Sequence, residues 1–310
     1  IFVRSNGNRE LIGRSLLVSD DPPKPTSHSG FTIRLRFTDE RADPRFFAYL
    51  LRGDTIRRSL SSQGGGTSIN NLNQSILSRL TVCLPPLETQ RRIAAILGAY
   101  DDLIEVNRRR VAVLEEMARG LFEEWFVRFR FPGHEAVPIL DTPDGPLPQG
   151  WAVGPLGGIL ALNYGRALKA DTRVAGPVAV YGSSGIVGSH NQALVDGPGV
   201  VLGRKGNVGS VIWAPGDFWP IDTTYYVETP LPLTYVHELL RRVPFQNTDA
   251  AVPGLNREYA LSRVVVHPPI ELVKNYGKFA SSLREQALLI AGSNDKLAAS
   301  RDLLLPRLIS

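Results

Sequence analysis

Hydrophobic positions between Leu87 and Phe131 recur at alternating spacings of four and three residues. This average period of 3.5 is typical of a helix that buries one narrow stripe against a partner helix, as in a coiled coil. We therefore predict a long helix over residues 87–131, whose stripe consists of Ile93, Leu97, Tyr100, Ile104, Asn107, Val111, Leu114, Ala118, Leu121 and Trp125. Asn107 is its polar member, and a buried asparagine in such a stripe lowers stability but fixes register, so leucine there should keep or raise stability and loosen register. The alternative is an ordinary amphipathic helix packed on a domain.

A second stripe with the same spacing closes the chain. It consists of Leu283, Ala287, Ile290, Asn294, Leu297, Arg301, Leu304 and Leu308. The stripe predicts a helix over residues 271–310 that ends near Pro306, because proline removes an interior helical hydrogen bond. The two helices are expected to pair with each other, either within one chain or between two.

Short motifs recur 183 residues apart, which indicates an internal repeat. Leu72-Asn73 and Pro85-Pro86 return as Leu255-Asn256 and Pro268-Pro269. Three further segments correspond, namely a β-type run at 77–82 and 261–266, a short helix at 46–51 and 235–240, and a loop at 3–8 and 202–207.

The repeat predicts an α+β chain made of two copies of one unit, each a globular domain followed by a long helix. The predicted parts are a first globular domain at 1–86, a central helix at 87–131, a linker at 132–150, a second globular domain at 151–270 and a distal helix at 271–310. The proline-rich linker is expected to be extended. Trp151 precedes Arg204 by 53 residues, whereas three residues precede Arg4, so about 50 residues of the first copy are expected to be missing.

Composition narrows the class of protein. A length of 310 residues and a hydrophobic fraction of 43% suffice for about two folded domains. The net charge of +5 weakly favours a polyanionic partner. The single thiol, Cys83, cannot form an internal disulfide or a CxxC zinc site, which favours a cytoplasmic location. No stretch of the sequence has the pattern of a membrane span.

The glycine-rich loop at residues 203–210 invites a phosphate-binding interpretation, but it lacks the Lys that follows the last glycine of a P-loop. A tight turn between two strands is the structural interpretation. The functional alternative is that the turn presents Arg204, Lys205 and Asn207 to base edges in DNA, since Arg or Lys bonds guanine and Asn bonds adenine. Further candidates for DNA contact are Arg4, Asn6, Asn8 and Arg9 in the matching first loop, and Tyr181, Ser183 and Asn191 in nearby turns.

None of the candidate motifs in the sequence matches a catalytic site. The sequence His237-Glu238-Leu239-Leu240-Arg241 has arginine where a zinc protease needs its second histidine, and residues 182–185 do not form a GxSxG elbow. We therefore predict neither catalytic nor metal-binding residues.

Several ordered motifs resemble the specificity subunits of type I restriction-modification systems. They are the segments at 84–94, 101–104, 147–157, 203–210, 218–226 and 304–310. The resemblance implies two target-recognition domains, the first incomplete, that each bind half of a split double-stranded DNA sequence. It also implies that the two helices pair as an antiparallel coiled coil and dock two modification subunits, to which restriction subunits attach. The expected pairing and docking residues are Ile93, Leu97, Ile104, Asn107, Val111, Leu114, Leu121, Leu283, Ile290, Asn294 and Leu297.

The same resemblance implies a non-enzymatic subunit without a cofactor of its own, whereas its partners would use S-adenosylmethionine, ATP and Mg. Two other functions stay open on the sequence. One is an interaction or anti-restriction protein that binds modification subunits without contacting DNA, and the other is a self-contained DNA methyltransferase or nuclease.

Overall fold

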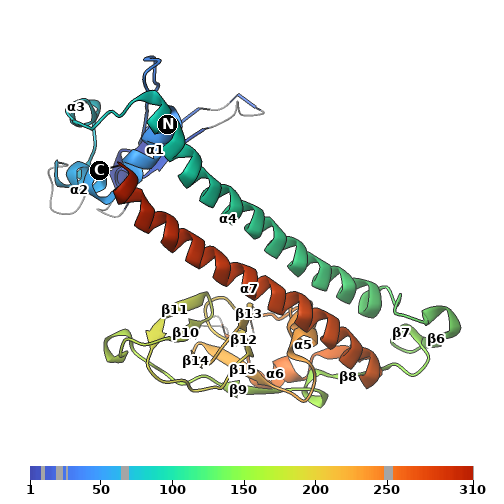
Figure 1. Ribbon diagram of the computed structural model, residues 1–310. Coiled ribbons are helices and arrows are strands. Elements are labelled where there is room, and N and C mark those ends of the chain that lie inside the picture. Colours follow the sequence, from blue (N-terminus) through green and yellow to red (C-terminus); the bar gives the residue numbers. More distant parts are fainter. Residues whose placement is uncertain (8–10, 19–23, 26, 64–69, 248–253, 310) are drawn as a thin grey trace. The chain divides into compact units, whose positions relative to one another are not determined.

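The two heptad stripes form two long helices, α4 (Leu87–Phe122) and α7 (Ile270–Ile309) (Figure 1). The computed structural model describes residues 1–7, 11–18, 24–25, 27–63, 70–247 and 254–309. Every predicted stripe position is buried or half-buried, whereas most positions between them are exposed. The spacing therefore identified the buried face of both helices.

The helix ends differ from the prediction. Helix α4 continues as a π-helical turn, Glu123–Val127, and stops short of Phe131. The predicted end at Pro306 is wrong, because α7 continues to Ile309. Proline removes a single hydrogen bond there, while Leu308 and Ile309 beyond it pack against the hydrophobic cluster around Phe46 and Leu97.

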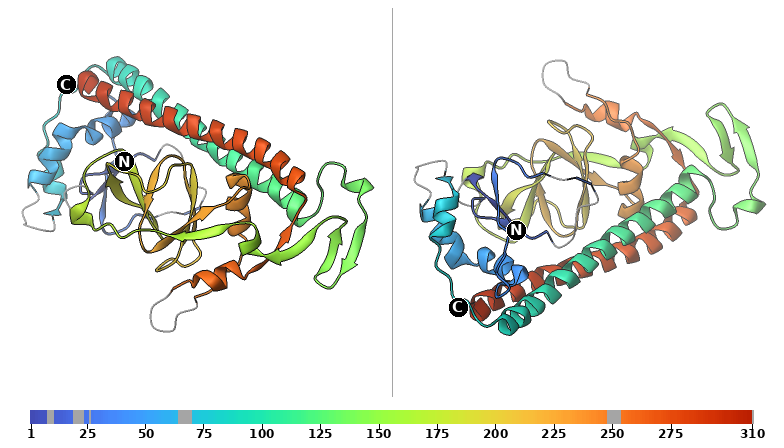
Figure 2. Two further views of the ribbon diagram at one scale, coloured as in Figure 1. Left: turned by 90° about the horizontal axis from the view of Figure 1, so that it is seen from below. Right: turned by 90° about the horizontal axis from the view of Figure 1, so that it is seen from above.

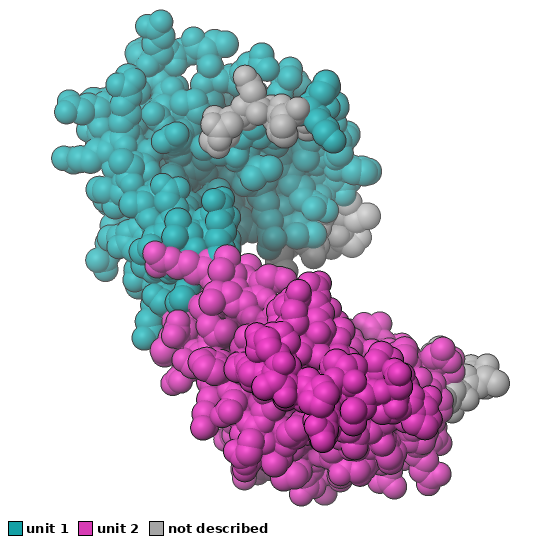
Figure 3. All heavy atoms as spheres, turned by 90° about the vertical axis from the view of Figure 1, so that its right-hand side faces the viewer, with its two compact units in different colours: residues 1–109, 290–310 teal, residues 110–289 magenta. Residues whose placement is uncertain are grey.

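Contacts divide the chain into two compact units (Figure 3). Unit 1 comprises residues 1–109 and 290–310, and unit 2 comprises residues 110–289. Each unit contains one globular part together with a segment of α4 and a segment of α7. No described helix combines the length and hydrophobicity that a membrane crossing needs.

Unit 1 has a three-stranded antiparallel sheet in the order β3-β1-β4, with a small β2–β5 ladder beside it. Its elements before α4 are β1 (Phe2–Arg4), β2 (Asn6–Gly7), β3 (Ser15–Leu16), β4 (Thr32–Arg34), α1 (Pro44–Arg52), α2 (Asp54–Gln63), β5 (Asn70–Asn71) and α3 (Gln74–Ser78).

Gln90 joins the first globular part to α4. Its side chain is fully buried, donates to the carbonyls of Arg41 and Pro85 at 2.8 Å, and accepts from the N–H of Asp43 at 2.9 Å. Asp43 in turn caps α1 by accepting from the N–H groups of the first turn. All the polar atoms of the glutamine amide are therefore engaged in holding the start of α4 beside α1.

Unit 2 has a four-stranded antiparallel sheet in the order β13-β12-β15-β9 and a three-stranded sheet in the order β11-β10-β14. Its strands are β6 (Ile139–Thr142), β7 (Gly145–Pro148), β8 (Ala152–Pro155), β9 (Ala161–Tyr164), β10 (Val178–Gly182), β11 (Gly185–His190), β12 (Gly199–Gly203), β13 (Val211–Ala214), β14 (Phe218–Pro220), β15 (Thr224–Glu228) and β16 (Val264–His267). Its short helices are α5 (Leu233–Leu240) and α6 (Arg257–Leu261). The core packs the aromatic rings of Phe122, Trp125 and Phe126 from the end of α4 against Tyr235 and Tyr276.

The predicted linker is not an extended connection. Residues 139–148 form the β6–β7 hairpin, which is drawn in light green beyond the end of α4 (Figure 2). Pro143 and Asp144 make the turn, and Gly145, the first residue after it, has a φ of 105°. The prolines at 146 and 148 fit a two-stranded ribbon, because each strand of such a ribbon has an unpaired edge.

The two units contain equivalent hydrogen bonds at the repeated sequence motifs. Asn73 caps α3 by accepting from the N–H of Ile76, and Asn256 caps α6 by accepting from the N–H of Tyr259. The residue before each cap donates its N–H to a loop carbonyl, Leu72 to Ser5 at 2.7 Å and Leu255 to Arg204 at 2.8 Å. The short helices expected at 46–51 and 235–240 are α1 and α5.

One pair of repeated segments differs. Residues 264–267 form β16, which pairs with β8, whereas residues 79–86 form no strand. A strand requires a partner strand, and among the described residues none pairs with residues 79–86. The same sequence pattern therefore becomes a strand only in unit 2.

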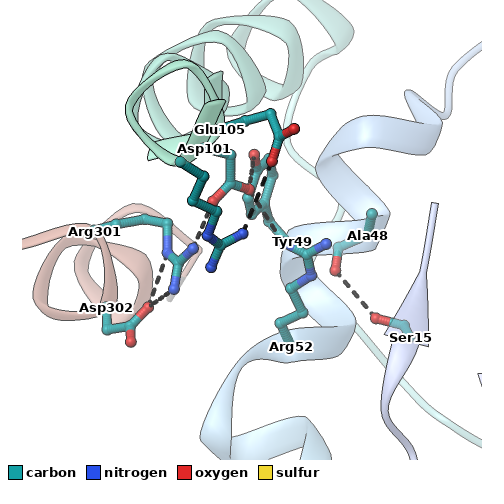
Figure 4. Close-up of polar contacts among 9 residues, drawn as sticks. Ser15, Ala48, Tyr49, Arg52, Asp101, Glu105, Arg301 and Asp302 are labelled. Carbon is teal, nitrogen blue, oxygen red and sulfur yellow. Dashed lines mark hydrogen bonds and ion pairs between the residues drawn. The ribbon is translucent and has the colours of Figure 1, made fainter. Parts of the chain in front are cut away.

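Each unit holds its α4 or α7 segment through a charged cluster. In unit 1, Asp101 on α4 accepts from the Tyr49 hydroxyl at 2.8 Å and pairs with Arg52 and Arg301 (Figure 4). In unit 2 the arginine lies on the long helix and the carboxylate lies on the globular part. Arg284 on α7 is 4.0 Å from Glu238 of α5, and its guanidinium stacks 4.2 Å from the centre of the Trp213 ring.

Candidate nucleic-acid interface

The candidate loop in unit 2 joins β12 to β13 and is closed by backbone hydrogen bonds. Gly203 donates to Ser210 at 2.7 Å, and Gly209 donates back to Gly203 at 2.9 Å. A Cβ on Gly203 would lie 2.1 Å from the carbonyl oxygen of Asn207, so only glycine allows this closure. The tight turn predicted from the sequence is confirmed.

Arg204 is held in place rather than free to move. Its N–H donates to the carbonyl of Thr223 at 2.9 Å, and its Nη1 donates to the carbonyl of Asp222 at 3.1 Å. The guanidinium lies 5.0 Å from the centre of the Tyr164 ring and 5.9 Å from that of Tyr225. Arginine stacked in this way loses little side-chain entropy when it binds a ligand.

A second arginine shares the same aromatic ring. The guanidinium of Arg257, at the start of α6, lies 5.2 Å from the centre of the Tyr164 ring, which is 49% exposed. Tyr225 beneath is buried, which raises its pKa to about 12, and its hydroxyl donates to the carbonyl of Leu255 at 2.8 Å. We call Tyr164, Arg204 and Arg257 the arginine–tyrosine cluster.

The tip of the loop is polar. Asn207 is exposed, its Nδ2 donates to the Ser184 hydroxyl at 3.1 Å, and Lys205 beside it is half-buried. Ser183 is buried, and its carbonyl accepts from the Ser210 hydroxyl at 2.6 Å. Ser183 therefore supports the loop from inside the protein instead of presenting a side chain to a ligand.

Two other predicted contact residues lie apart from the loop tip. The prediction that Tyr181 lies on a recognition surface is wrong. This residue is 3% exposed, and its ring packs edge-on against Phe218 in the core. The aromatic stretch from Phe218 to Tyr226 is largely core as well, with both Phe218 and Trp219 buried. Asn191 is exposed in the turn after β11.

Unit 1 contains a counterpart of this loop with the same hydrogen bonds. Arg4 donates its N–H to Arg14 at 2.8 Å and accepts from Gly13 at 2.9 Å, as Gly203 does with Ser210 and Gly209. Both closing glycines have left-handed backbones, with φ of 74° at Gly13 and 76° at Gly209. Ser5 donates to Phe31 at 2.8 Å, as Arg204 does to Thr223.

The two loops differ in chemistry. Ser5 occupies the place of Arg204, Asn6 that of Lys205, and Gln74 of α3 that of Arg257. Arg4 is exposed and donates its Nε to the carbonyl of Asn6 at 3.0 Å. Asn8 and Arg9 lie outside the described residues. The loops therefore share a backbone but carry different side chains.

Tyr164 and Arg257 were not among the residues predicted from the sequence to contact DNA. Neither is near the loop in the chain, and Tyr164 reaches it only because β9 pairs with β15, where Tyr164 lies opposite Tyr225. The repeat could have pointed to Arg257, because this residue directly follows the repeated pair Leu255-Asn256.

The long helices contact each other within each unit. In unit 1, the Nδ2 of Asn107 donates to the Oδ1 of Asn294 at 2.9 Å, and the Nδ2 of Asn294 donates to the carbonyl of Ile104 at 3.3 Å. In unit 2, the Tyr276 hydroxyl donates to the carbonyl of Ala118 at 3.1 Å. The predicted members Ile93, Leu97 and Ile104 are buried, while Val111, Leu114, Leu121, Leu283, Ile290 and Leu297 are half-buried.

Parts of this chain are similar in sequence to the specificity subunits of type I restriction enzymes. Residues 21–116 match the family described as "Type I restriction modification DNA specificity domain". The MjaIX specificity subunit of Methanocaldococcus jannaschii is 33% identical over 120 residues, which are 39% of this chain and 28% of that protein. The HindI specificity subunit of Haemophilus influenzae is 42% identical over 53 residues, 17% of this chain and 12% of that protein. The matches thus span about a third or less of these relatives.

The fold also has a solved counterpart. The crystal structure of a type I restriction-modification S subunit from M. genitalium superposes with a TM-score of 0.60 and 17% identity, covering 100% of this chain and 82% of that one. At this identity the likeness establishes the mixed α+β fold alone.

Proposed function

We propose that this chain is a specificity subunit of a type I restriction-modification system and that it selects the DNA sequence on which partner subunits act. In this proposal the chain is non-catalytic. It binds a bipartite double-stranded DNA target and docks the modification and restriction subunits.

The duplicated loop carries the proposal. Both loops are closed by the same hydrogen bonds on the same kind of strand pair, yet Ser5 and Gln74 stand where the other loop has Arg204 and Arg257. Two equivalent supports with different side chains suit a protein that contacts two half-sites of different sequence. DNA sequence is selected by contacts to base edges, whereas phosphate contacts fix position.

We assign separate tasks to the residues of the second loop. Arg204 is rigid and planar, as bidentate hydrogen bonding to guanine requires, and Asn207 at the exposed tip has the amide that bonds adenine. Lys205 and Arg257 supply positive charge for the phosphate backbone. Tyr181 and Ser183 have no contact role in this proposal because both are buried.

The long helices are proposed to pair as an antiparallel coiled coil within one chain. The bond between Asn107 and Asn294 and the bond between Tyr276 and Ala118 support antiparallel pairing, since residue numbers rise on one helix as they fall on the other. Such a pair would set the distance between the half-sites. One heptad adds about 10 Å, or about three base pairs at 3.4 Å per step.

The outer face of α4 suits the docking of a modification subunit. Ile96, Leu103 and Val106 in unit 1 are 39–44% exposed, and the same heptad spacing continues to Val113 and Met117 in unit 2, which are 58% and 53% exposed. A second apolar stripe at this spacing fits a helix of a partner protein. The buried stripe residues would then maintain the helix pair, and the outer stripe would bind the partner.

Mapping of methylated bases in a strain with and without this gene tests the proposal. Loss of one bipartite methylated motif on deletion, restored by the wild-type gene, is the expected result. Gel-shift assays of the purified chain with and without modification subunits provide the second readout. Binding to modification subunits with no DNA shift in either state would overturn the proposal in favour of an interaction protein, and methylation or cleavage by the chain alone would indicate an enzyme.

A further inference from the structure

Three turns of unit 2 meet at the candidate DNA-contacting loop, residues 203–210. The turn between β10 and β11 contributes Ser184, whose hydroxyl accepts from the Nδ2 of Asn207 at 3.1 Å. The turn between β14 and β15 contributes Asp222, whose carbonyl accepts from the Nη1 of Arg204 at 3.1 Å. Side chains that flank these turns therefore lie beside the residues to which we assign base contacts.

Two exposed apolar side chains follow the β10–β11 turn. Ile186 is 65% exposed, and Val187 is 41% exposed. Ile186 lies two residues beyond Ser184, so at about 3.3 Å per residue the Cα atoms of these two residues are about 7 Å apart. Successive base pairs of DNA are about 3.4 Å apart. Ile186 is therefore within reach of base pairs one or two steps from the base pair that Asn207 would contact.

The segment that carries Ile186 is held in a fixed conformation. The register of the β10–β11 pair shifts between residues 180 and 181, so Val187 is the extra residue of a β-bulge. Arg173 fixes this bulge, because its Nη1 donates to the carbonyl of Val187 at 2.6 Å and its Nη2 donates to the carbonyl of Leu168 at 3.2 Å. Bulges redirect side chains, and a side chain on a fixed backbone loses little entropy when it binds a ligand.

The chemistry of isoleucine restricts what it can contact in DNA. Its side chain forms no hydrogen bonds, so the polar edges of the bases and the phosphates would lose water against it without gaining a partner. The C5 methyl group of thymine is the apolar group that the major groove presents, and apolar side chains contact it. An exposed isoleucine beside base-contacting polar residues therefore fits a thymine.

We propose that Ile186 contacts the C5 methyl group of a thymine in the half-site bound by unit 2. This thymine lies within about two base pairs of the base that Asn207 contacts. The inference rests on the proposed function, because it requires that the loop of unit 2 contacts base edges. Selection in this half-site then combines hydrogen bonds from Arg204 and Asn207 with an apolar contact from Ile186.

Replacement of single thymines by deoxyuridine tests the contact, because uracil keeps the hydrogen-bonding groups of thymine and lacks the methyl group. The chain assembled with modification subunits is titrated with duplexes that carry the methylated motif. The half-site of unit 2 is the one whose methylation changes in Arg204→Ala. We expect one replacement in this half-site to weaken binding by about fourfold, the effect of one buried methyl group.

Variants of the chain connect this effect to Ile186. In Ile186→Ala the same replacement should change the affinity by less than about 1.5-fold, because the apolar partner of the methyl group is absent. Ile186→Leu keeps an apolar side chain and should retain most of the effect. Val174→Ala is the matched control, since Val174 is 55% exposed and its N–H donates to His190 at the far end of β11. This control should respond to deoxyuridine as the wild type does.

The inference is overturned if no replacement weakens binding by the wild type, or if Ile186→Ala responds to the replacement as the wild type does. Sequence-selective binding by the wild type in either case would leave the proposed function intact. Weaker binding of modification subunits by Ile186→Ala, with unchanged affinity for DNA, would make Ile186 a protein contact and would also contradict the inference. DNA binding without sequence selectivity would refute the proposed function and the inference together.

Discussion

The side-chain amide of Asn107 on α4 donates to the amide oxygen of Asn294 on α7, at 2.9 Å and across 187 residues of sequence. Asn107 is 7% exposed, and Asn294 also donates to the carbonyl of Ile104. A hydrogen bond between two stripe residues forms in one alignment of the helices only, because a shift by one turn would leave both amides without this partner. The pair therefore acts as a register marker in unit 1.

The first prediction concerns this pair. From the sequence, Asn107→Leu alone was expected to keep or raise stability, but the structure predicts a loss of about 1–3 kcal/mol because the Asn294 oxygen loses its amide donor. The double variant, Asn107→Leu with Asn294→Leu, should be at least as stable as the wild type, but the alignment of α4 against α7 should be less fixed. Urea unfolding of both variants measures the first effect. The spacing of half-sites methylated by the assembled complex measures the second, and unchanged spacing in the double variant would refute the register role.

The second prediction concerns pH. Burial alone would raise the pKa of Asp101, but hydrogen bonds from Arg301 and Tyr49 and the charges of Arg301 and Arg52 outweigh it, so its pKa lies below the usual 3.8. A carboxyl with a lowered folded pKa contributes stability above its unfolded pKa and loses it as the pH falls through the folded value. Asp101→Asn should thus cost about 1–2 kcal/mol near pH 7 and much less below pH 3.

Unfolding measured at pH 7 and at about pH 2, below the lowered pKa, checks this difference. Asp102→Asn, at the exposed neighbouring position on α4, serves as the matched control and should change stability little at either pH. An equal loss of stability for Asp101→Asn at both ends of the range would show that the carboxylate charge plays no part.

The third prediction concerns base selection. Arg204→Ala should weaken or relax methylation at one half-site only, with a loss of about 1–3 kcal/mol in base discrimination. Arg204→Lys should restore charge but little selectivity, because lysine lacks the planar fork that stacks on Tyr164. Arg119→Ala removes the same charge from the exposed face of α4 and is the control. Equal losses at both half-sites would count against a role in local base contact.

The fourth prediction concerns phosphate contact. Arg257→Gln gives the second unit the residue that Gln74 provides in the first, and should weaken DNA binding at all sequences to a similar degree. The slope of log affinity against log salt should become shallower by about 1, as expected for one lost phosphate contact. Titrations at several salt concentrations give that slope. A changed sequence preference with an unaltered slope would instead make Arg257 a base-contacting residue.

Periodicity and repetition made part of this molecule predictable. Heptad spacing identified the buried stripes of α4 and α7, because a helix turns by nearly the same angle at every residue. The repeated Pro-Pro pairs marked two matching helix starts, and the repeated Leu-Asn pairs proved in the structure to be two matching caps. By contrast, Tyr181 was assigned to the surface and lies in the core, since its burial depends on packing against Phe218, a distant residue.

Periodicity and repetition along the chain predicted which residues face inward on the long helices, where these helices start after the Pro-Pro pairs, and which loop is a tight glycine turn. Each of these is set by neighbours within a few residues, or by a repeat visible in the chain. The three-dimensional fold was needed to show that Tyr164 and Arg257 join Arg204, that Asn107 meets Asn294, and that residues 264–267 form a strand while residues 79–86 do not. These relationships arise from strand pairing and helix packing between segments far apart in the sequence, and a strand forms only where a partner strand is present.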